Sequence, residues 1–171
     1  ATGSVGLIMV EGGTVRGGLA HQGSICIWDD SFIPGLRRLS GAIRETGASV
    51  GIQINHAGPR IMDTTVGGQP VSPSGIPIRK EWGLREIPVK PRALREDEME
   101  GIAQSYAEAA ARAVEAGFDV VEIHGAHGLL LCHFLSPLTN LRADRYGGNI
   151  NGRVTFPCEV VAAVRKSIGD D

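Results

Sequence analysis

Two histidines, His124 and His127, are the residues of this sequence best placed to do chemistry. They lie three residues apart, directly after the apolar run 118–123, and the residues between them are glycine and alanine. Neutral imidazoles can donate hydrogen bonds to an oxyanion, including the charge that develops when hydride adds to an activated alkene. A metal site is the alternative, but the spacing differs from the i, i+4 pattern of helical zinc sites, and no obvious carboxylate ligand follows.

Polar residues also follow two other apolar runs. Glu11, Gly12 and Gly13 follow residues 5–10, and Gln53 lies at the end of the run 48–54. Ligands of parallel α/β folds bind at the carboxyl ends of the strands, where the connecting loops converge. We therefore expect these segments to lie beside the two histidines, although Gln53 could instead cap a layer of core side chains.

The intervening segments predict the fold. The three apolar runs are typical of strands buried on both faces, as in a parallel sheet. Helices are predicted from about residue 30, capped by Asp30 or Ser31 and ended by Gly47, and over residues 96–116 and 154–167. The last two helices place Val114 and Val161 on their apolar stripes. Strands that alternate with amphipathic helices indicate an α/β fold with parallel strands.

Residues 61–94 are rich in proline and glycine, and they predict a short hairpin inserted between the second strand and the helix at 96–116. Three buried parallel strands are too few for an independent α/β domain. We expect residues 1–171 to form one domain that is part of a larger barrel.

Composition excludes several classes of function. The 17 basic and 19 acidic side chains give a net charge of −2, so the chain has no excess of positive charge that would attract nucleic acid. No apolar run approaches the ~20 residues that span a bilayer. The 3 cysteines include no C-x-x-C pair, so no disulfide framework or metal cluster is predicted and a reducing cytoplasm is expected. A Cys132–His133 nucleophile is not favoured, because residues 129–132 form an apolar packing face.

The sequence as a whole closely resembles the old yellow enzyme family of FMN-dependent ene-reductases, with the related NADH oxidases and dienoyl-CoA reductases. The most specific block runs from residue 118 through His-Gly-Ala-His-Gly (124–128) and Phe-Leu-Ser-Pro-Leu-Thr-Asn (134–140) to Tyr-Gly-Gly (146–148). Further matches are residues 6–8, 11–12, 27–29, 33–36, 56–58, 70–71 and 73–74. The resemblance covers essentially the whole chain.

This resemblance implies an FMN-binding TIM barrel, (β/α)8, of which the chain is the N-terminal half, without the first strand and the C-terminal strands. Gly12 would lie against the flavin through its backbone, and Gln53 would bind the pyrimidine edge of the ring. His124 and His127 would polarise the substrate carbonyl, and His124 would also approach the flavin. The implied oxidoreductase passes hydride from NADH or NADPH through FMN to a small molecule with an activated C=C bond, and a homo-oligomer is compatible with it.

One position departs from the family pattern. Leu129 stands where most members have the tyrosine that donates a proton to the substrate carbon, so solvent or another residue such as His133 would have to serve. The resemblance also puts the flavin phosphate contacts outside this chain, which predicts weak FMN retention by residues 1–171 alone. Two other interpretations stay open: a non-catalytic truncated barrel fragment, and a metal-dependent barrel hydrolase.

Overall fold

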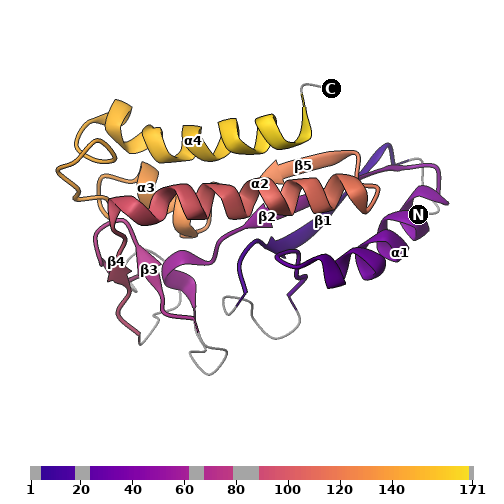
Figure 1. Ribbon diagram of the computed structural model, residues 1–171, viewed down its shortest axis with the longest axis horizontal. Coiled ribbons are helices and arrows are strands. Elements are labelled where there is room, and N and C mark those ends of the chain that lie inside the picture. Colours follow the sequence, from indigo (N-terminus) through magenta and orange to yellow (C-terminus); the bar gives the residue numbers. More distant parts are fainter. Residues whose placement is uncertain (1–4, 18–23, 62–67, 79–88, 170–171) are drawn as a thin grey trace.

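The computed structural model describes residues 5–17, 24–61, 68–78 and 89–169. A central three-stranded sheet is formed by β1 (Leu7–Thr14), β2 (Ser49–Asn55) and β5 (Val120–Ile123). The helices are α1 (Ile33–Arg44), α2 (Met99–Glu115), α3 (Leu130–Leu135) and α4 (Ile150–Ile168). Two short strands, β3 (Val71–Ser72) and β4 (Arg92–Ala93), lie apart from the sheet (Figure 1).

The strands of the central sheet are parallel and follow the order β1-β2-β5. Ile52 on β2 is paired with Val10 on β1 and with Val121 on β5. All three strands point toward the end of the molecule where α3, β3 and β4 lie (Figure 1). The predicted α/β fold with parallel strands is therefore confirmed, and the carboxyl ends of the strands share one edge.

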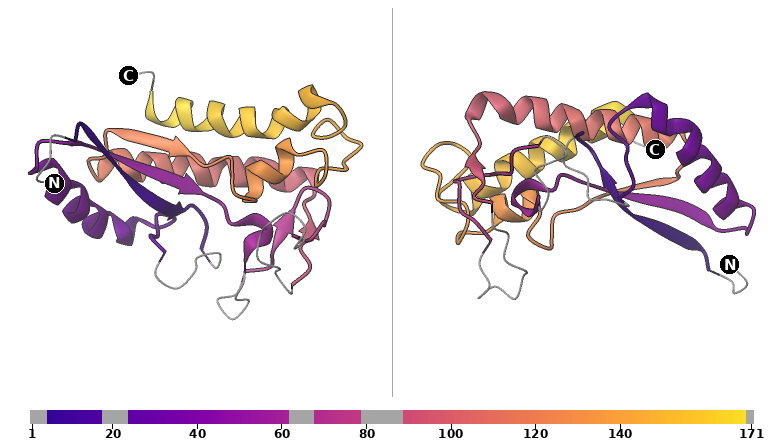
Figure 2. Two further views of the ribbon diagram at one scale, coloured as in Figure 1. Left: turned by 180° about the vertical axis from the view of Figure 1, so that it is seen from behind. Right: turned by 90° about the horizontal axis from the view of Figure 1, so that it is seen from below.

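The two faces of the sheet differ in what covers them. On one face, Val50, Ile52 and Ile54 are fully buried beneath α1 and α2, and α4 packs against α2 and α3 (Figure 2). On the opposite face, Leu7 and Met9 of β1 are 43% and 37% exposed. We expected β1 to be buried on both faces, and this is wrong among the described residues. The described helices cover one face of the sheet and leave the other face of β1 exposed. An uncovered inner face is what a partial barrel presents.

The helix ends follow local capping. Asp29, rather than the predicted Asp30 or Ser31, accepts a hydrogen bond from the Ser31 amide at 2.9 Å, so the first turn begins one residue earlier. α1 ends at Arg44, with Glu45 as its C-cap, so the helix stops before Gly47; Gly47 does adopt the predicted left-handed conformation, with φ +83°. The last helix begins at Ile150, four residues before the predicted start, because the Asn149 side chain caps it by accepting from the Gly152 amide at 3.2 Å.

Two predicted elements need correction. β1 does not end before Glu11 but continues to Thr14, with a shift in register between Val10 and Gly13. The insertion is not a hairpin in its described part, since β3 and β4 pair in parallel; residues 62–67 and 79–88 lie outside the described residues. The apolar packing face expected at residues 129–132 is confirmed, since Leu130 and Leu131 are buried in the core at the start of helix α3. Across the described ranges, no helix has both the length and the apolar character needed to cross a membrane.

Candidate active site

A cavity of about 300 Å³ lies at the carboxyl ends of the three strands. It brings together all four site residues predicted from the sequence: Gly12 from β1, Gln53 from β2, and His124 and His127 from the loop after β5. The complete lining consists of Glu11, Gly12, Thr14, Ser24, Gln53, Asn55, Ala57, Arg60, His124, His127 and Leu129.

The two histidines are hydrogen-bonded to each other. His127 Nδ1 lies 3.1 Å from His124 Nε2, and the rings meet edge to face at 88° with their centroids 4.9 Å apart. The Ala126 amide donates to His124 Nδ1 at 3.2 Å. Because His124 Nδ1 accepts, its proton lies on Nε2 and is donated to His127 Nδ1. The hydrogen-bond pattern thus leaves the Nε2–H of His127 as the donor available to another molecule.

The surroundings of His124 favour its neutral form. Burial is the main cause that lowers its pKa below the usual value, and the neighbouring His127 and Arg60 act in the same direction. The carboxylate of Glu122 opposes them. A neutral imidazole at neutral pH is the form that the hydrogen-bond pattern of the pair requires.

His127 has an unusual backbone conformation. Its φ of +54° is left-handed, and it is the one non-glycine residue of the described chain with positive φ. Such a conformation costs about 1–3 kcal/mol and persists only where the surroundings hold it. Arg60 supplies one such restraint, since its Nη1 donates to the His127 carbonyl at 2.6 Å. Sequence reasoning missed Arg60, although it lies only two residues after the strand-end segment that ends at Gly58.

Gln53 is oriented by a neighbour on the next strand. Gln53 and Glu122 are paired across β2 and β5, and the Gln53 amide nitrogen donates to a carboxylate oxygen of Glu122. This contact leaves the Gln53 amide oxygen free to accept a hydrogen bond at the cavity. Glu122 was also missed; its position two residues before His124, on the same face of a strand, was the available signal.

Gly12 presents bare backbone to the cavity. Its φ is +72°, and a Cβ built on it would meet no atom within 4 Å, so the space above it is open. A side chain there would be strained by the positive φ and would project into that open space. Glycine at this position allows a flat ligand to approach the main chain closely.

The start of α3 places Leu129 in the cavity and turns His133 away from it. Leu129 is half-buried and lines the cavity. His133 is 2% exposed, lies in the core outside the cavity lining, and burial lowers its pKa to about 4. His133 is therefore not positioned to deliver a proton in place of the missing tyrosine. In the described part of the chain, no third His, Cys, Asp or Glu joins the histidine pair to make a metal-ligand set.

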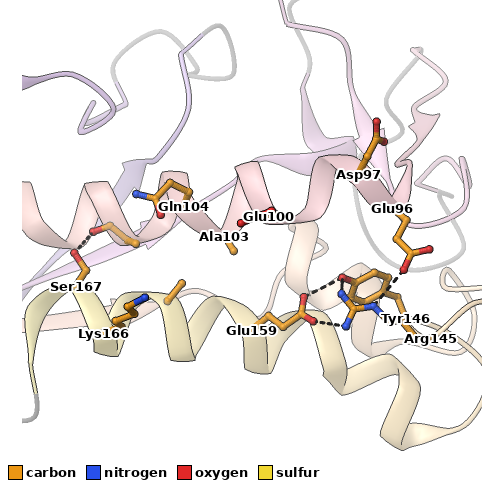
Figure 3. A pocket seen from close by; sticks show the side chains of 12 residues that line it. Glu96, Asp97, Glu100, Ala103, Gln104, Arg145, Tyr146, Glu159, Lys166 and Ser167 are labelled. Atoms are coloured by element: carbon orange, nitrogen blue, oxygen red, sulfur yellow. Dashed lines mark hydrogen bonds and ion pairs between the residues drawn. The ribbon is translucent and has the colours of Figure 1, made fainter.

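A larger cavity of about 610 Å³ lies between α2 and α4, on the outer side of the helix layer (Figure 3). Its lining carries more acidic than basic side chains, and Arg145 is shared between Glu159 at 2.9 Å and Glu96 at 3.2 Å. The strand ends contribute no residue to its lining. We therefore assign the site to the smaller cavity, where polar groups from three strands converge on open space.

Comparison with known proteins identifies the family. The profile of the NADH:flavin oxidoreductase / NADH oxidase family matches residues 1–171. A metal reductase of Desulforamulus reducens is 48% identical over an alignment of 173 residues that covers 100% of this chain and 25% of that protein. An NADPH dehydrogenase of Geobacillus thermodenitrificans is 42% identical over 167 residues, 97% of this chain and 46% of that protein.

Among solved structures, morphinone reductase superposes with a TM-score of 0.86 at 34% identity, covering 95% of this chain and 47% of that chain. The chain thus spans between a quarter and a half of the length of these relatives. The family expected from the sequence motifs is confirmed. The chain belongs to the NADH:flavin oxidoreductase / NADH oxidase family.

Proposed function

We propose that this chain is part of an FMN-dependent oxidoreductase that passes hydride from NADH or NADPH to an activated C=C bond. The observation that carries the proposal is the hydrogen-bonded pair His124–His127 facing the same cavity as Gly12 and Gln53. The family and the name of the Geobacillus relative, an NADPH dehydrogenase, support the nicotinamide as electron donor.

The residues around the cavity fit a flavin ring. Gly12 offers open main chain against which a flat ring can lie. Gln53 offers an amide oxygen that can accept from the N–H of the pyrimidine edge, because its amide nitrogen is held by Glu122. The chemistry that bound FMN would supply is two-electron transfer as hydride between the nicotinamide and the alkene.

The histidine pair would activate the substrate. When hydride adds to an alkene conjugated to a carbonyl, negative charge accumulates on the carbonyl oxygen. The Nε2–H of His127 is available to donate to that oxygen, while the hydrogen bond from His124 fixes the orientation of the His127 ring. A donor held in place before the reaction stabilises this charge without reorganisation during the chemical step.

We also propose that residues 1–171 supply three consecutive strands, the second to the fourth, of one FMN-binding TIM barrel. The match to 47% of the morphinone reductase chain supports this arrangement. So does the open face of the sheet, where Met9 and Val120 are 37% and 40% exposed. In a closed barrel, the inward-facing side chains of the other strands cover such a face.

The test uses the longest natural protein that carries this chain. Purified protein should show the visible absorption of oxidised flavin, lose it when NADH or NADPH is added without oxygen, and regain it when an alkene with two carbonyl substituents follows. A colourless protein would favour the non-catalytic fragment, and stoichiometric zinc would favour the barrel hydrolase. Flavin that is reduced but not reoxidised by any activated alkene would refute the proposed acceptor.

A further inference from the structure

A second cavity of about 300 Å³ lies next to the candidate active site and shares no residue with it. It is bordered by the segment after β1, by the end of β2 and by the segments that carry β3 and β4. Asn55 and Ala57 line the active-site cavity, whereas His56 between them lines this one. The polar side chains of its lining are Arg16, His56, Gln69, Arg92 and Glu98.

His56 lines this cavity and holds a buried hydrogen-bond donor that has no partner among the described residues. The residue is 1% exposed, and its Nδ1 accepts from the Gly58 amide at 3.0 Å, so its proton lies on Nε2. Within the described part of the chain, this buried Nε2 has no hydrogen-bond partner. Burial lowers the pKa of His56 to about 3, which keeps the ring neutral. A buried donor without an acceptor is unfavourable, so an acceptor atom in the cavity would stabilise this arrangement.

Among the residues that the structure describes, one cation that lines the cavity forms no ion pair. Arg92 binds Glu98 through two hydrogen bonds of 2.7 Å each, so these two charges neutralise one another. The Gln69 amide oxygen accepts from Arg92 Nε at 3.3 Å, which leaves the Gln69 amide nitrogen as a further donor. Arg16 is exposed and forms no ion pair with any residue that the structure describes. Its charge is near enough to His56 to help lower the pKa of that ring.

We propose that this cavity binds a small carboxylate, held by the Nε2–H of His56 and the guanidinium of Arg16. A monoanion matches the positive charge of Arg16, which has no ion-pair partner among the described residues, and its oxygens match the donors of the cavity lining. Phosphate, with up to two negative charges, would place excess charge beside the Glu98 carboxylate. The site requires neither the flavin nor the histidine pair of the active site, so it stands whether or not the proposed reaction is correct.

Acetate is the probe that tests this site. Imidazole ¹H–¹⁵N signals of the FMN-loaded protein are followed at pH 7 while sodium acetate replaces sodium chloride at constant ionic strength. We expect the Nε2–H signal of His56, assigned by its loss in His56→Gln, to move and reach saturation. In Arg16→Gln, acetate should bind at least about tenfold more weakly, because a charge-assisted hydrogen bond is lost.

Arg38→Gln is the matched control, since Arg38 is an exposed arginine on α1 whose side chain donates to the Pro34 carbonyl within its own helix. This variant should bind acetate like the wild type. If His56→Gln does not fold, the comparison of Arg16→Gln with Arg38→Gln still decides, because both replaced side chains are exposed. A His56 signal that acetate does not shift, or that shifts equally in Arg16→Gln, overturns the proposal. Tighter binding of inorganic phosphate than of acetate overturns the assignment to carboxylates.

Discussion

His124 and His127 are hydrogen-bonded to each other, so they do not both present a free N–H to the cavity. The Nε2 of His124 donates to the Nδ1 of His127 across 3.1 Å, with the two rings nearly perpendicular. One imidazole therefore keeps a free N–H at the cavity, and the other determines which nitrogen of the first carries the proton. This division of roles makes the two histidines distinguishable by mutation.

Replacing His127 by alanine should slow alkene reduction by roughly 10²–10³-fold, the usual effect of losing one donor to a developing oxyanion. Binding of phenol-type inhibitors should weaken as well, because a phenolate oxygen accepts the same hydrogen bond. Reduction of the flavin by NADPH should fall less, since a nicotinamide that gives up hydride develops no negative charge on its own carbonyl oxygen. Stopped-flow measurement of the two half-reactions separates these effects.

His124→Ala should also slow alkene reduction and weaken the binding of phenol-type inhibitors. The remaining His127 ring loses the partner that fixes the position of its proton and its orientation. His124→Gln is the informative companion, since a glutamine amide can still donate to His127 Nδ1 and should recover part of the loss. Unchanged inhibitor binding in both alanine variants would remove the pair from the substrate site.

Gly12→Ala should lower the affinity for FMN, because a methyl group would occupy the open space above the main chain. Gly47→Ala is a matched control: Gly47 also has a positive φ, +83° against +72°, and a Cβ there also meets no atom within 4 Å. Both variants should lose a similar stability, roughly 1–2 kcal/mol, from the left-handed backbone. Only Gly12→Ala should release flavin on dilution, which fluorescence of the free cofactor measures. Equal flavin loss in both variants would mean that strain, not the ring contact, is responsible.

Acid should destabilise the fold well before its carboxylates titrate. Burial lowers the pKa of His56 to about 3 and that of His133 to about 4, from an unfolded value of 6.5. Below pH 6.5 the unfolded chain therefore binds protons at both rings while the folded chain does not. The free energy of unfolding should fall as pH falls, by up to about 2.7 kcal/mol per pH unit for the two groups between pH 6.5 and 4.

Urea unfolding at pH 7 and pH 5 measures this slope. His133→Gln should reduce it by up to about 1.4 kcal/mol per pH unit, because one of the two proton-binding differences is removed. A free energy of unfolding that stays constant between pH 7 and pH 5 would show that neither imidazole is held neutral by burial.

The strands and long helices could be predicted because their signals are local. The run at 48–54 became β2, and the 3–4 spacing of Met99, Ile102 and Tyr106 marked the buried stripe of α2. Val114 and Val161 fit the same periodicity but are 50% and 53% exposed. Periodicity cannot show which part of an apolar stripe its neighbours cover.

The candidate site could be predicted in part. The rule that ligands gather at the carboxyl ends of parallel strands placed Gly12, Gln53 and the histidine pair together. Glu122 and Arg60 were missed because their contacts depend on strand register and on the path of a loop. The parallel pairing of β3 with β4 was missed for a similar reason, since two-residue strands have no periodic pattern to detect.

Leu129 supports the last prediction, which concerns proton delivery. The residue lines the cavity at the start of α3, where an aliphatic side chain can donate no proton, and His133 is buried away from it. Completing the reduction of an alkene requires a proton at the carbon next to the one that receives hydride. A positioned donor accelerates such a step by roughly 10²–10⁴-fold. We therefore expect strongly activated alkenes to be reduced adequately and simple cyclic enones to be poor substrates.

Leu129→Tyr should then accelerate reduction of 2-cyclohexenone by at least about tenfold, because it places a phenol O–H in the cavity. Leu129→Phe is the control, since it adds the same ring without the hydroxyl and should give no gain. A solvent isotope effect on the alkene half-reaction that changes between wild type and Leu129→Tyr, but not in Leu129→Phe, would identify proton transfer as the altered step. If the wild type reduces the enone as fast as its flavin is reduced, or if Leu129→Tyr and Leu129→Phe behave alike, proton delivery does not limit the reaction at this position.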